Sequence, residues 1–210
     1  MQERRSPLDE ASFPAVLAGA QQGAAWAAEC LFTDLQPRLL RFLRAAEPRV
    51  ADDLAGEVWL AMARGIGTFE GDLPACRAWV FAIARRRLAD HRRTGARRAT
   101  DPVDHEFFLD REDANTSRRG DTADLVMNRL SAQAAVDLIS ANLGPDQAEV
   151  LLLRVLGDLD VAHVAEVMGR TPNWVRVAQH RALHRLASVL TRQPEEDVTD
   201  VVMLADPAAI

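Results

Sequence analysis

The residue types with the most distinctive chemistry are arginines that cluster near the middle of the chain. Between Arg85 and Arg98 there are seven arginines and one acid, Asp90, which gives the stretch a local charge of +6. The residues before it, from Gly71, place apolar side chains three and four positions apart, as in a helix packed on a core. A helix with so much positive charge suits a polyanion such as a nucleic acid. The alternative is a solvated helix end, because arginines near a carboxyl terminus also complement the helix dipole.

A second basic segment lies near the carboxyl end of the chain. Residues 170–194 contain five arginines and no acid. Thr171 followed by Pro172 is typical of a helix start, and Gly169 separates this helix from a short one predicted over residues 161–168. Two helices joined by a short turn that contains glycine have the outline of a helix-turn-helix. An ordinary antiparallel helix pair is the alternative.

In a helix-turn-helix, the second helix enters the major groove and side chains near its amino terminus reach the base edges. Asn, Gln and Arg can each pair with adenine or guanine through two hydrogen bonds, which are worth about 1–3 kcal/mol of discrimination. The candidate DNA-reading residues are Asn173, Arg176, Val177, Gln179 and His180. The residues whose spacing faces them toward the core are Trp174, Val175, Ala178, Ala182, Leu183 and Leu186.

The remaining polar residues give little support for catalysis or for a metal. His180 and His184 stand four apart, but no carboxylate or cysteine lies nearby in the sequence to complete a site. The sequence has no glycine-rich phosphate loop and no nucleophile elbow. Asp52, Asp53 and Glu57 form the nearest approach to a carboxylate cluster, and their place at a helix start favours a dipole role or a partner surface. We therefore expect neither an enzyme nor a cofactor.

The net charge of −6 over 210 residues does not exclude DNA binding, because the acids are segregated. Residues 100–124 contain eight acids and three arginines, and residues 195–210 contain five acids and no base. No apolar run approaches the 18 residues of a membrane span, and the amino terminus lacks the apolar core of a signal peptide. Cys30 and Cys76 lie in apolar helical settings and are interpreted as buried thiols. We expect a cytoplasmic protein with no membrane insertion.

The apolar periodicity predicts an all-α protein of two small helical domains. The expected helices cover residues 12–22, 24–46, 52–64 and 74–98 in the first domain, and a second helical unit begins near residue 123. The predicted divisions are an amino-terminal tail 1–11, a first domain 12–95, a flexible acidic linker 96–122, a second domain 123–191 and an acidic, then apolar tail 192–210.

Four sequence blocks, taken in order, resemble one protein family. They are DDLAGEVWL at residues 52–60, FEGD at 69–72 followed by RAWVFAIAR at 77–85, the segment 143–155, and the helix-turn-helix with VRVAQHRAL at 161–186. From about Ser12 to Leu190 the chain resembles the extracytoplasmic-function (group IV) sigma factors of bacterial RNA polymerase, in an actinobacterial-type subgroup. The resemblance implies a sigma region 2 domain for residues 12–95 and a sigma region 4 domain for residues 123–191.

The resemblance also implies partners and site residues. The partners would be core RNA polymerase, through its β′ clamp and β flap, promoter DNA and an anti-sigma factor, with no homo-oligomer. The implied clamp-binding residues are Asp52, Asp53, Leu54, Glu57 and Val58. The implied −10 residues are Phe69, Gly71 and Asp72 around a flipped base, Trp79 at the melting edge, and Arg85, Arg86, Arg92 and Arg93 on the strand. The implied −35 set adds Thr171 and Arg181 to the DNA-reading residues above. For Trp79, a place in the core is the alternative.

The preferred interpretation is thus a promoter-specificity subunit without an active site; the alternatives are a free-standing helix-turn-helix regulator and a helical enzyme or scaffold. Two promoter elements about sixteen base pairs apart are separated by roughly 55 Å of DNA. A linker of about 28 residues spans at most about 95 Å, so it can connect domains bound at both elements. The chain has Gly56 where the family usually has glutamine and Arg86 where many members have asparagine. The resemblance therefore gives no promoter sequence.

Overall fold

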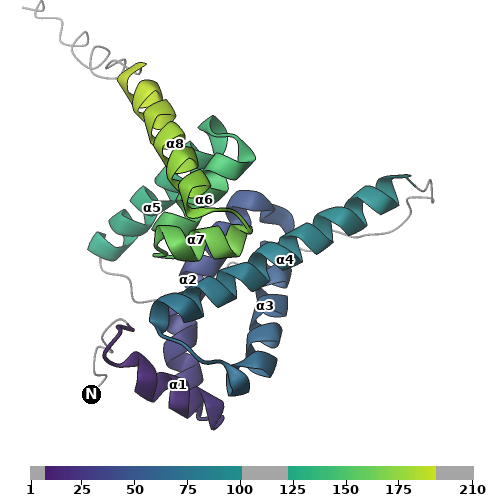
Figure 1. The fold of residues 1–210 in the computed structure, drawn as a ribbon, viewed down its shortest axis with the longest axis vertical. Helices are drawn as coiled ribbons and strands as arrows, with labels where there is room; N and C mark the ends of the chain where they lie inside the picture. The colour runs from purple at the N-terminus through teal and green to yellow at the C-terminus, as the bar shows by residue number, and fades with distance from the viewer. Residues whose placement is uncertain (1–7, 101–122, 193–210) are drawn as a thin grey trace, which may run out of the picture.

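The computed structural model describes the backbone of residues 8–100 and 123–192, and the side chains of residues 8–94 and 133–191. This part of the chain contains eight α-helices, two short 3-10 helices and no strand, which confirms the predicted all-α fold (Figure 1). The α-helices are α1 Phe13–Gln21, α2 Ala25–Ala46, α3 Ala51–Gly65, α4 Leu73–Thr100, α5 Ala123–Asn142, α6 Pro145–Val155, α7 Val161–Met168 and α8 Pro172–Arg192. Most of the expected linker and of the carboxyl-terminal tail lie outside the described residues.

The first domain consists of α1 to α4. Helix α1 packs on α2, α3 packs on α4, and α2 contacts both α3 and α4. Its core holds large apolar side chains such as Phe13, Leu39 and Val58, and Phe42 meets Phe81 edge to face with ring centroids 5.3 Å apart. Helix α4 continues to Thr100, five residues beyond residue 95, because Ala and Arg are good helix formers.

The second domain consists of α5 to α8, with a core built around Val150, Leu153, Val164 and Val175. Helices α6 and α8 pack together, and α7 packs on α8. Because α7 has only eight residues, its ends depend on capping. At its start the Asp160 carboxylate accepts a hydrogen bond of 2.8 Å from the backbone N–H of His163.

The turn between α7 and α8 fixes the direction of α8. Gly169 adopts the left-handed conformation, with φ at 63°, that ends many helices. Its own N–H and that of Arg170 donate to carbonyls in the last turn of α7. The Thr171 hydroxyl accepts a hydrogen bond of 3.2 Å from the N–H of Trp174, as expected of an N-cap. The three residues between the helices therefore have the conformation that the sequence predicts.

The two domains pack against each other. Helix α7 lies along α4, and α5 contacts α2 (Figure 1). The helix-turn-helix thus rests on the arginine-ended helix through its first helix, while α8 projects away from the first domain. The sequence predicts two separate domains and gives no sign of this packing.

Candidate nucleic-acid and polymerase interfaces

The four arginines of α4 that are predicted to contact a DNA strand fall into two stripes, because residues seven apart lie on the same side of a helix. Trp79, Arg86 and Arg93 form one stripe, and Arg86 and Arg93 are exposed. Arg85 and Arg92 form the other stripe. This second stripe borders a groove of about 450 Å³ whose far wall comes from α5 and α6. Trp79, Arg86 and Arg93 do not line this groove.

The arginines of the second stripe have carboxylate partners. Arg85 Nε lies 3.0 Å from Glu149 Oε1 of α6, and Arg92 Nε lies 2.8 Å from Glu47 Oε1 at the end of α2. In the first stripe, Arg93 pairs with Asp90 one turn earlier on the same exposed surface, at 2.7 Å. Arg86 makes no ion pair within the described residues. The four predicted strand-contacting arginines thus differ in how free they are to meet a phosphate.

The loop before α4 is braced from several sides. The Phe69 ring stacks on Trp79 with centroids 5.0 Å apart and an interplanar angle of 24°, and Gln21 of α1 donates a hydrogen bond of 2.9 Å to the Phe69 carbonyl. Gly71 has φ at 151°, and a Cβ there would lie 3.0 Å from Ala75 Cβ and 3.1 Å from the Phe69 ring. The loop therefore needs glycine at this position both for conformation and for space.

Asp72 has a structural role that the sequence did not indicate. Its Oδ1 accepts a hydrogen bond of 2.8 Å from the N–H of Ala75, and its carbonyl accepts one of 2.9 Å from Cys76, so it caps α4. Trp79 is half-buried. A Cβ on Gly65 would lie 2.7 Å from its ring, so the ring lies between the end of α3 and Phe69. The structure thus joins Phe69, Gly71, Asp72 and Trp79 in one cluster at the start of α4.

The exposed face of α8 carries the predicted DNA-reading residues. Asn173, Arg176, His180 and Arg181 are exposed, Val177 is 41% exposed, and Gln179 is half-buried. The opposite side buries Val175, Ala178 and Ala182 at spacings of three and four. The prediction that Leu183 faces the core is wrong: it is 51% exposed because it follows Ala182 directly, about 100° around the helix.

The histidines of α8 interact with each other. His180 Nε2 and His184 Nε2 lie 3.1 Å apart, and the ring centroids are separated by 4.4 Å. No third His, Cys, Asp or Glu joins them, and no metal-binding group of three such residues occurs among the described residues. At this distance two neutral rings form a hydrogen bond in which one Nε2–H donates to the other Nε2.

The predicted polymerase-binding residues separate into two groups. Asp52, Asp53 and Glu57 are exposed on α3, whereas Leu54 and Val58 are buried in the domain core. The two buried residues are therefore not available to contact a partner directly, and their role is to fix the carboxylates on the outer face.

An apolar patch beside these carboxylates was not predicted. Phe32 and Trp59 pack with ring centroids 5.1 Å apart, and the Trp59 indole N–H donates to Gln36. Phe32 is 46% exposed, and Leu60, the next residue after Trp59, is 58% exposed. Trp59 and Leu60 belong to the sequence block at residues 52–60. Two adjacent large apolar residues in that block are the sequence feature from which the patch could have been predicted.

The sequence did not single out Arg77, whose side chain is buried together with that of Asp34. Its Nη2 lies 3.3 Å from Asp34 Oδ2 of α2, and its Nη1 lies 2.8 Å from Asp158 Oδ2 in the α6–α7 turn. Arg77 therefore links both domains.

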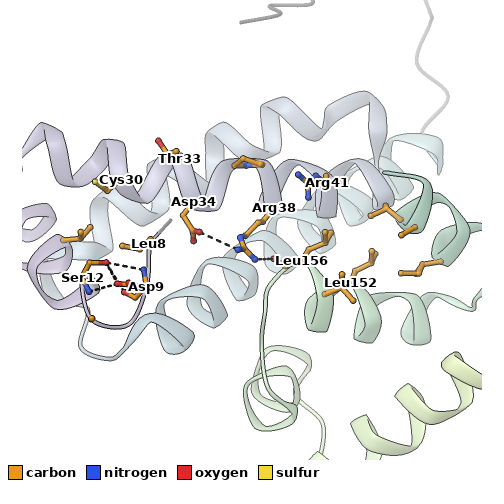
Figure 2. A pocket seen from close by; sticks show the side chains of 17 residues that line it. Leu8, Asp9, Ser12, Cys30, Thr33, Asp34, Arg38, Arg41, Leu152 and Leu156 are labelled. Carbon is orange, nitrogen blue, oxygen red and sulfur yellow. Dashed lines mark hydrogen bonds and ion pairs between the residues drawn. The ribbon is translucent and has the colours of Figure 1, made fainter. Parts of the chain in front are cut away.

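The two cysteines differ in environment. Burial raises the pKa of the Cys76 thiol to about 12, so it stays protonated at neutral pH. Cys30 is only half-buried and lines the groove of Figure 2, so the prediction that both thiols are buried is wrong for Cys30. No helix in the described part of the chain is long and apolar enough to cross a lipid bilayer.

Comparison with known protein families identifies both helical domains. Residues 31–98 match the family model described as Sigma-70 region 2, and residues 133–186 match that described as Sigma-70, region 4. Among solved structures, the fold is similar to RpoE in a complex with the anti-sigma factor NepR from Bartonella quintana. That likeness has a TM-score of 0.56 and 20% identity, over 80% of this chain and 98% of that one.

Similar proteins of known class narrow the family further. An ECF RNA polymerase sigma factor of Streptomyces coelicolor, BldN, is 33% identical over 87% of this chain and 67% of its own length. Another, ShbA of Streptomyces griseus, is 31% identical over 81% of this chain and 91% of its own length. The chain therefore belongs to the extracytoplasmic-function sigma factors of RNA polymerase.

Proposed function

We propose that the two domains divide promoter recognition between α4 and α8. As a sigma factor, the chain binds core RNA polymerase and directs promoter-specific initiation without an active site of its own. The observation that carries the division is the stripe of Trp79, Arg86 and Arg93, which continues in line from the braced loop at residues 69–72. It spans about 21 Å of helix, enough to follow a strand over several nucleotides.

In this proposal the cluster at the start of α4 opens the −10 element. A flipped base costs a few kcal/mol to unstack, and that cost is recovered through a pocket and backbone contacts. Phe69 and Trp79 supply aromatic surface, and Gly71 lets the backbone approach closely. Asp72 contributes mainly by capping α4, with Oδ2 free to meet a base. Arg86 and Arg93 hold the strand, and Arg85 and Arg92 join them when their carboxylate partners move away.

The −35 element is read by α8. Thr171 fixes the start of the helix, and Asn173, Arg176, Gln179 and His180 present donors and acceptors suited to base edges. Arg181 is placed to meet a phosphate, and Val177 offers an apolar contact such as a thymine methyl group accepts.

The polymerase contact on α3 combines charge with apolar surface. Residues seven apart share a side of a helix, so Asp53 lies on the side of the exposed Leu60, and Asp52 lies on the side of Trp59, which packs on the exposed Phe32. An apolar centre with a polar rim is the usual composition of a protein interface. Glu57 pairs with Arg87 at 3.6 Å, and Asp52 pairs with Arg44 at 3.3 Å. These exposed pairs are weak and do not prevent a partner from binding the carboxylates. We propose the β′ clamp as that partner and the β flap as a contact of the second domain.

The domain divisions proposed are residues 12–95 and 123–191, with tails and a linker outside them. We also place the protein in the cytoplasm, where polymerase acts. An anti-sigma factor is a proposed regulator; the solved RpoE structure, whose fold is similar, contains one.

A reconstituted transcription assay tests the proposed function. Core polymerase is incubated with a library of random promoter DNA, with and without the chain, and transcript starts are sequenced. We expect transcript starts that appear only when the chain is added and that share two upstream sequence motifs. A Trp79→Ala chain should bind polymerase but lose initiation, and pre-opened promoter DNA should restore it. A free-standing regulator would instead footprint DNA without polymerase.

A further inference from the structure

The outer side of α8 carries two histidines in line with each other. Each helical residue turns the chain by about 100°, so His180 and His184 both lie about 160° around the helix from the buried Ala182. Both histidines are exposed, and Asn173 lies on the same outer line. His184 is therefore on the face that carries the predicted DNA-reading residues, although that set does not include it.

The two histidines differ in their distance from the start of α8. His180 lies eight positions after Pro172 and His184 lies twelve positions after it. At 1.5 Å per residue these positions are about 12 Å and about 18 Å along the helix. The major groove is about 12 Å wide, and the side chains that reach its base edges lie near the amino terminus of the helix. His180 is thus at the limit of base contact, and His184 lies beyond it.

The two imidazole rings contact each other. Their Nε2 atoms lie 3.1 Å apart, and the ring planes are tilted by 54° with centroids 4.4 Å apart. Neither ring has another hydrogen bond or an ion pair within the part of the chain that the structure describes. Residues 170–194 contain no acid, so no carboxylate of α8 competes for either ring. Among the described residues, His184 is therefore the group that orients the His180 ring.

A hydrogen bond between two imidazoles also fixes where their protons lie. A neutral ring has one N–H and one bare nitrogen, and the hydrogen bond made by one nitrogen determines which of the two is protonated. If His180 Nε2 accepts the proton of His184 Nε2, the proton of His180 lies on Nδ1, which can then donate. If His180 Nε2 donates instead, its Nδ1 can only accept. The choice made at His184 thus decides what His180 offers to a base.

The position of the rings on α8 favours the first arrangement in the complex with DNA. It places the free N–H on His180, within reach of the base edges, whereas the second places it on His184, beyond them. Acceptors are the more frequent groups in the major groove. Guanine presents two of them, N7 and O6, whereas the donors are the amino groups of adenine and cytosine. A donating His180 therefore fits guanine best.

We propose that His184 is a positioning residue of the −35 interface. Its Nε2–H donates to His180 Nε2, so that His180 presents Nδ1–H and selects guanine at one position of the element. The proposal rests on the proposed function of α8. Because His184 acts through His180, its removal changes the base preference at that position and leaves the remaining DNA contacts intact.

Base preference of the holoenzyme tests this role. Promoters with a randomised −35 element are selected with holoenzymes that contain wild type, His180→Ala, His184→Ala or both substitutions. His180→Ala identifies the position that His180 reads. We expect His184→Ala to reduce the preference for guanine about three- to tenfold at that position alone. The double variant should lose no more than His180→Ala, because the effects of residues that act as a unit are not additive.

Two further variants separate orientation of the ring from a general effect on the helix. Ser188→Ala is the matched control, because the exposed Ser188 hydroxyl donates to the His184 carbonyl at 2.8 Å and its loss leaves both rings in place. It should keep the wild-type preference. His184→Lys can only donate, so it should restore the preference for guanine. Circular dichroism establishes that all chains are equally helical.

Nuclear magnetic resonance of the free, full-length chain locates the protons themselves. With ¹⁵N-labelled histidine, long-range proton–nitrogen spectra distinguish Nδ1–H from Nε2–H in each ring. We expect the proton on Nδ1 of His180 and on Nε2 of His184, and a loss of the His180 preference in His184→Ala. This measurement requires neither polymerase nor DNA.

A proton on Nε2 of His180 in the wild-type chain would overturn the proposal. So would a His184→Ala variant that loses preference at a different position, or that binds all sequences equally weakly. If no substitution on α8, Asn173→Ala and Arg176→Ala included, changes the −35 preference, the proposed function of α8 fails and the guanine contact with it. The proton positions then still decide whether His184 orients His180.

Discussion

Phe69 stacks on Trp79 at a centroid distance of 5.0 Å, which connects the loop before α4 to the side of α4 that carries Arg86. The indole of Trp79 also abuts Gly65, so it is both part of the domain and half-exposed beside the loop. The sequence leaves two roles open for Trp79, a core residue and a DNA contact, and the two are compatible in this position. Replacement by another aromatic residue can distinguish the structural role from the role in DNA opening.

Trp79→Ala should reduce open-complex formation by more than tenfold, because it removes the aromatic surface at the melting edge. It should also lower the free energy of unfolding by about 1–3 kcal/mol, less than the loss at a fully buried tryptophan. Trp79→Phe should restore most of the stability and only part of the opening. Permanganate footprinting measures the unpaired bases, and urea denaturation measures the stability. Equal recovery of both quantities by Trp79→Phe would indicate a purely structural role.

Gly71→Ala should destabilise the first domain by about 1–3 kcal/mol, because alanine rarely adopts φ at 151° and its Cβ would crowd Phe69. Gly67→Ala is the matched control in the same loop region, where a Cβ would meet nothing within 4 Å. The control should change the free energy of unfolding by less than about 0.5 kcal/mol. Urea denaturation of the two variants checks this; a similar loss in both would contradict the assigned strain.

Arg86→Ala combined with Arg93→Ala should weaken binding of the holoenzyme to single-stranded promoter DNA and make it less sensitive to salt. Each lost phosphate contact lowers the slope of log affinity against log salt by about 0.7 for a single strand, so the double variant should lose about 1.4. The control is Arg44→Ala with Arg64→Ala, which removes the same charge from α2 and α3. If the slope of log affinity against log salt is unchanged in the Arg86/Arg93 variant, α4 is not the helix that binds the strand.

Asp160→Ala should destabilise the second domain by about 0.5–2 kcal/mol at neutral pH, through loss of the α7 cap. The hydrogen bond from the His163 N–H lowers the pKa of Asp160 from 3.8 in the folded state. The stabilisation is therefore present above that pH and is lost as the pH falls through the lower folded value. Thr171→Ala removes an N-cap that does not titrate, so the loss of stability in this variant should not depend on pH. The free energy of unfolding of both variants is measured by denaturation at pH 7 and at pH 3. A parallel change in the two variants between these pH values would contradict the assignment.

Cys30 should react with a thiol reagent well before Cys76 in the folded chain. Cys76 is buried and its pKa is raised to about 12, so almost none of it is thiolate at pH 8. Mass spectrometry after brief alkylation, with and without denaturant, distinguishes the two sites. Faster labelling of Cys76 under native conditions would show that the α4 core opens readily.

Local sequence features predicted the helices well, since helix starts and ends are set by nearby residues. Gly169, Thr171 and Pro172 placed the turn before α8, and apolar periodicity placed α2 and α3 to within about a residue. The α8 face at Asn173 and Arg176 followed from the same periodicity. These features depend on contacts between residues three or four apart, which a single sequence displays directly.

Contacts between distant residues were not accessible in this way. Arg77 and Asp158 are 81 positions apart, and nothing in the periodicity of either segment connects them. Arg77 appears in the sequence as one more arginine of α4, and Asp158 as a turn residue. The burial of Arg77 and the packing of α7 on α4 depend on tertiary structure, and so does the engagement of Arg85 by Glu149.

Mapping of the open complex with core polymerase shows whether the chain directs initiation through two promoter elements. Promoters selected from random DNA are footprinted with permanganate and a nuclease, with polymerase alone, the chain alone and both together. We expect protection of two elements about sixteen base pairs apart, with unpaired bases only at the downstream element and only when both proteins are present. Protection of a single element by the chain alone, unchanged by polymerase, would contradict it.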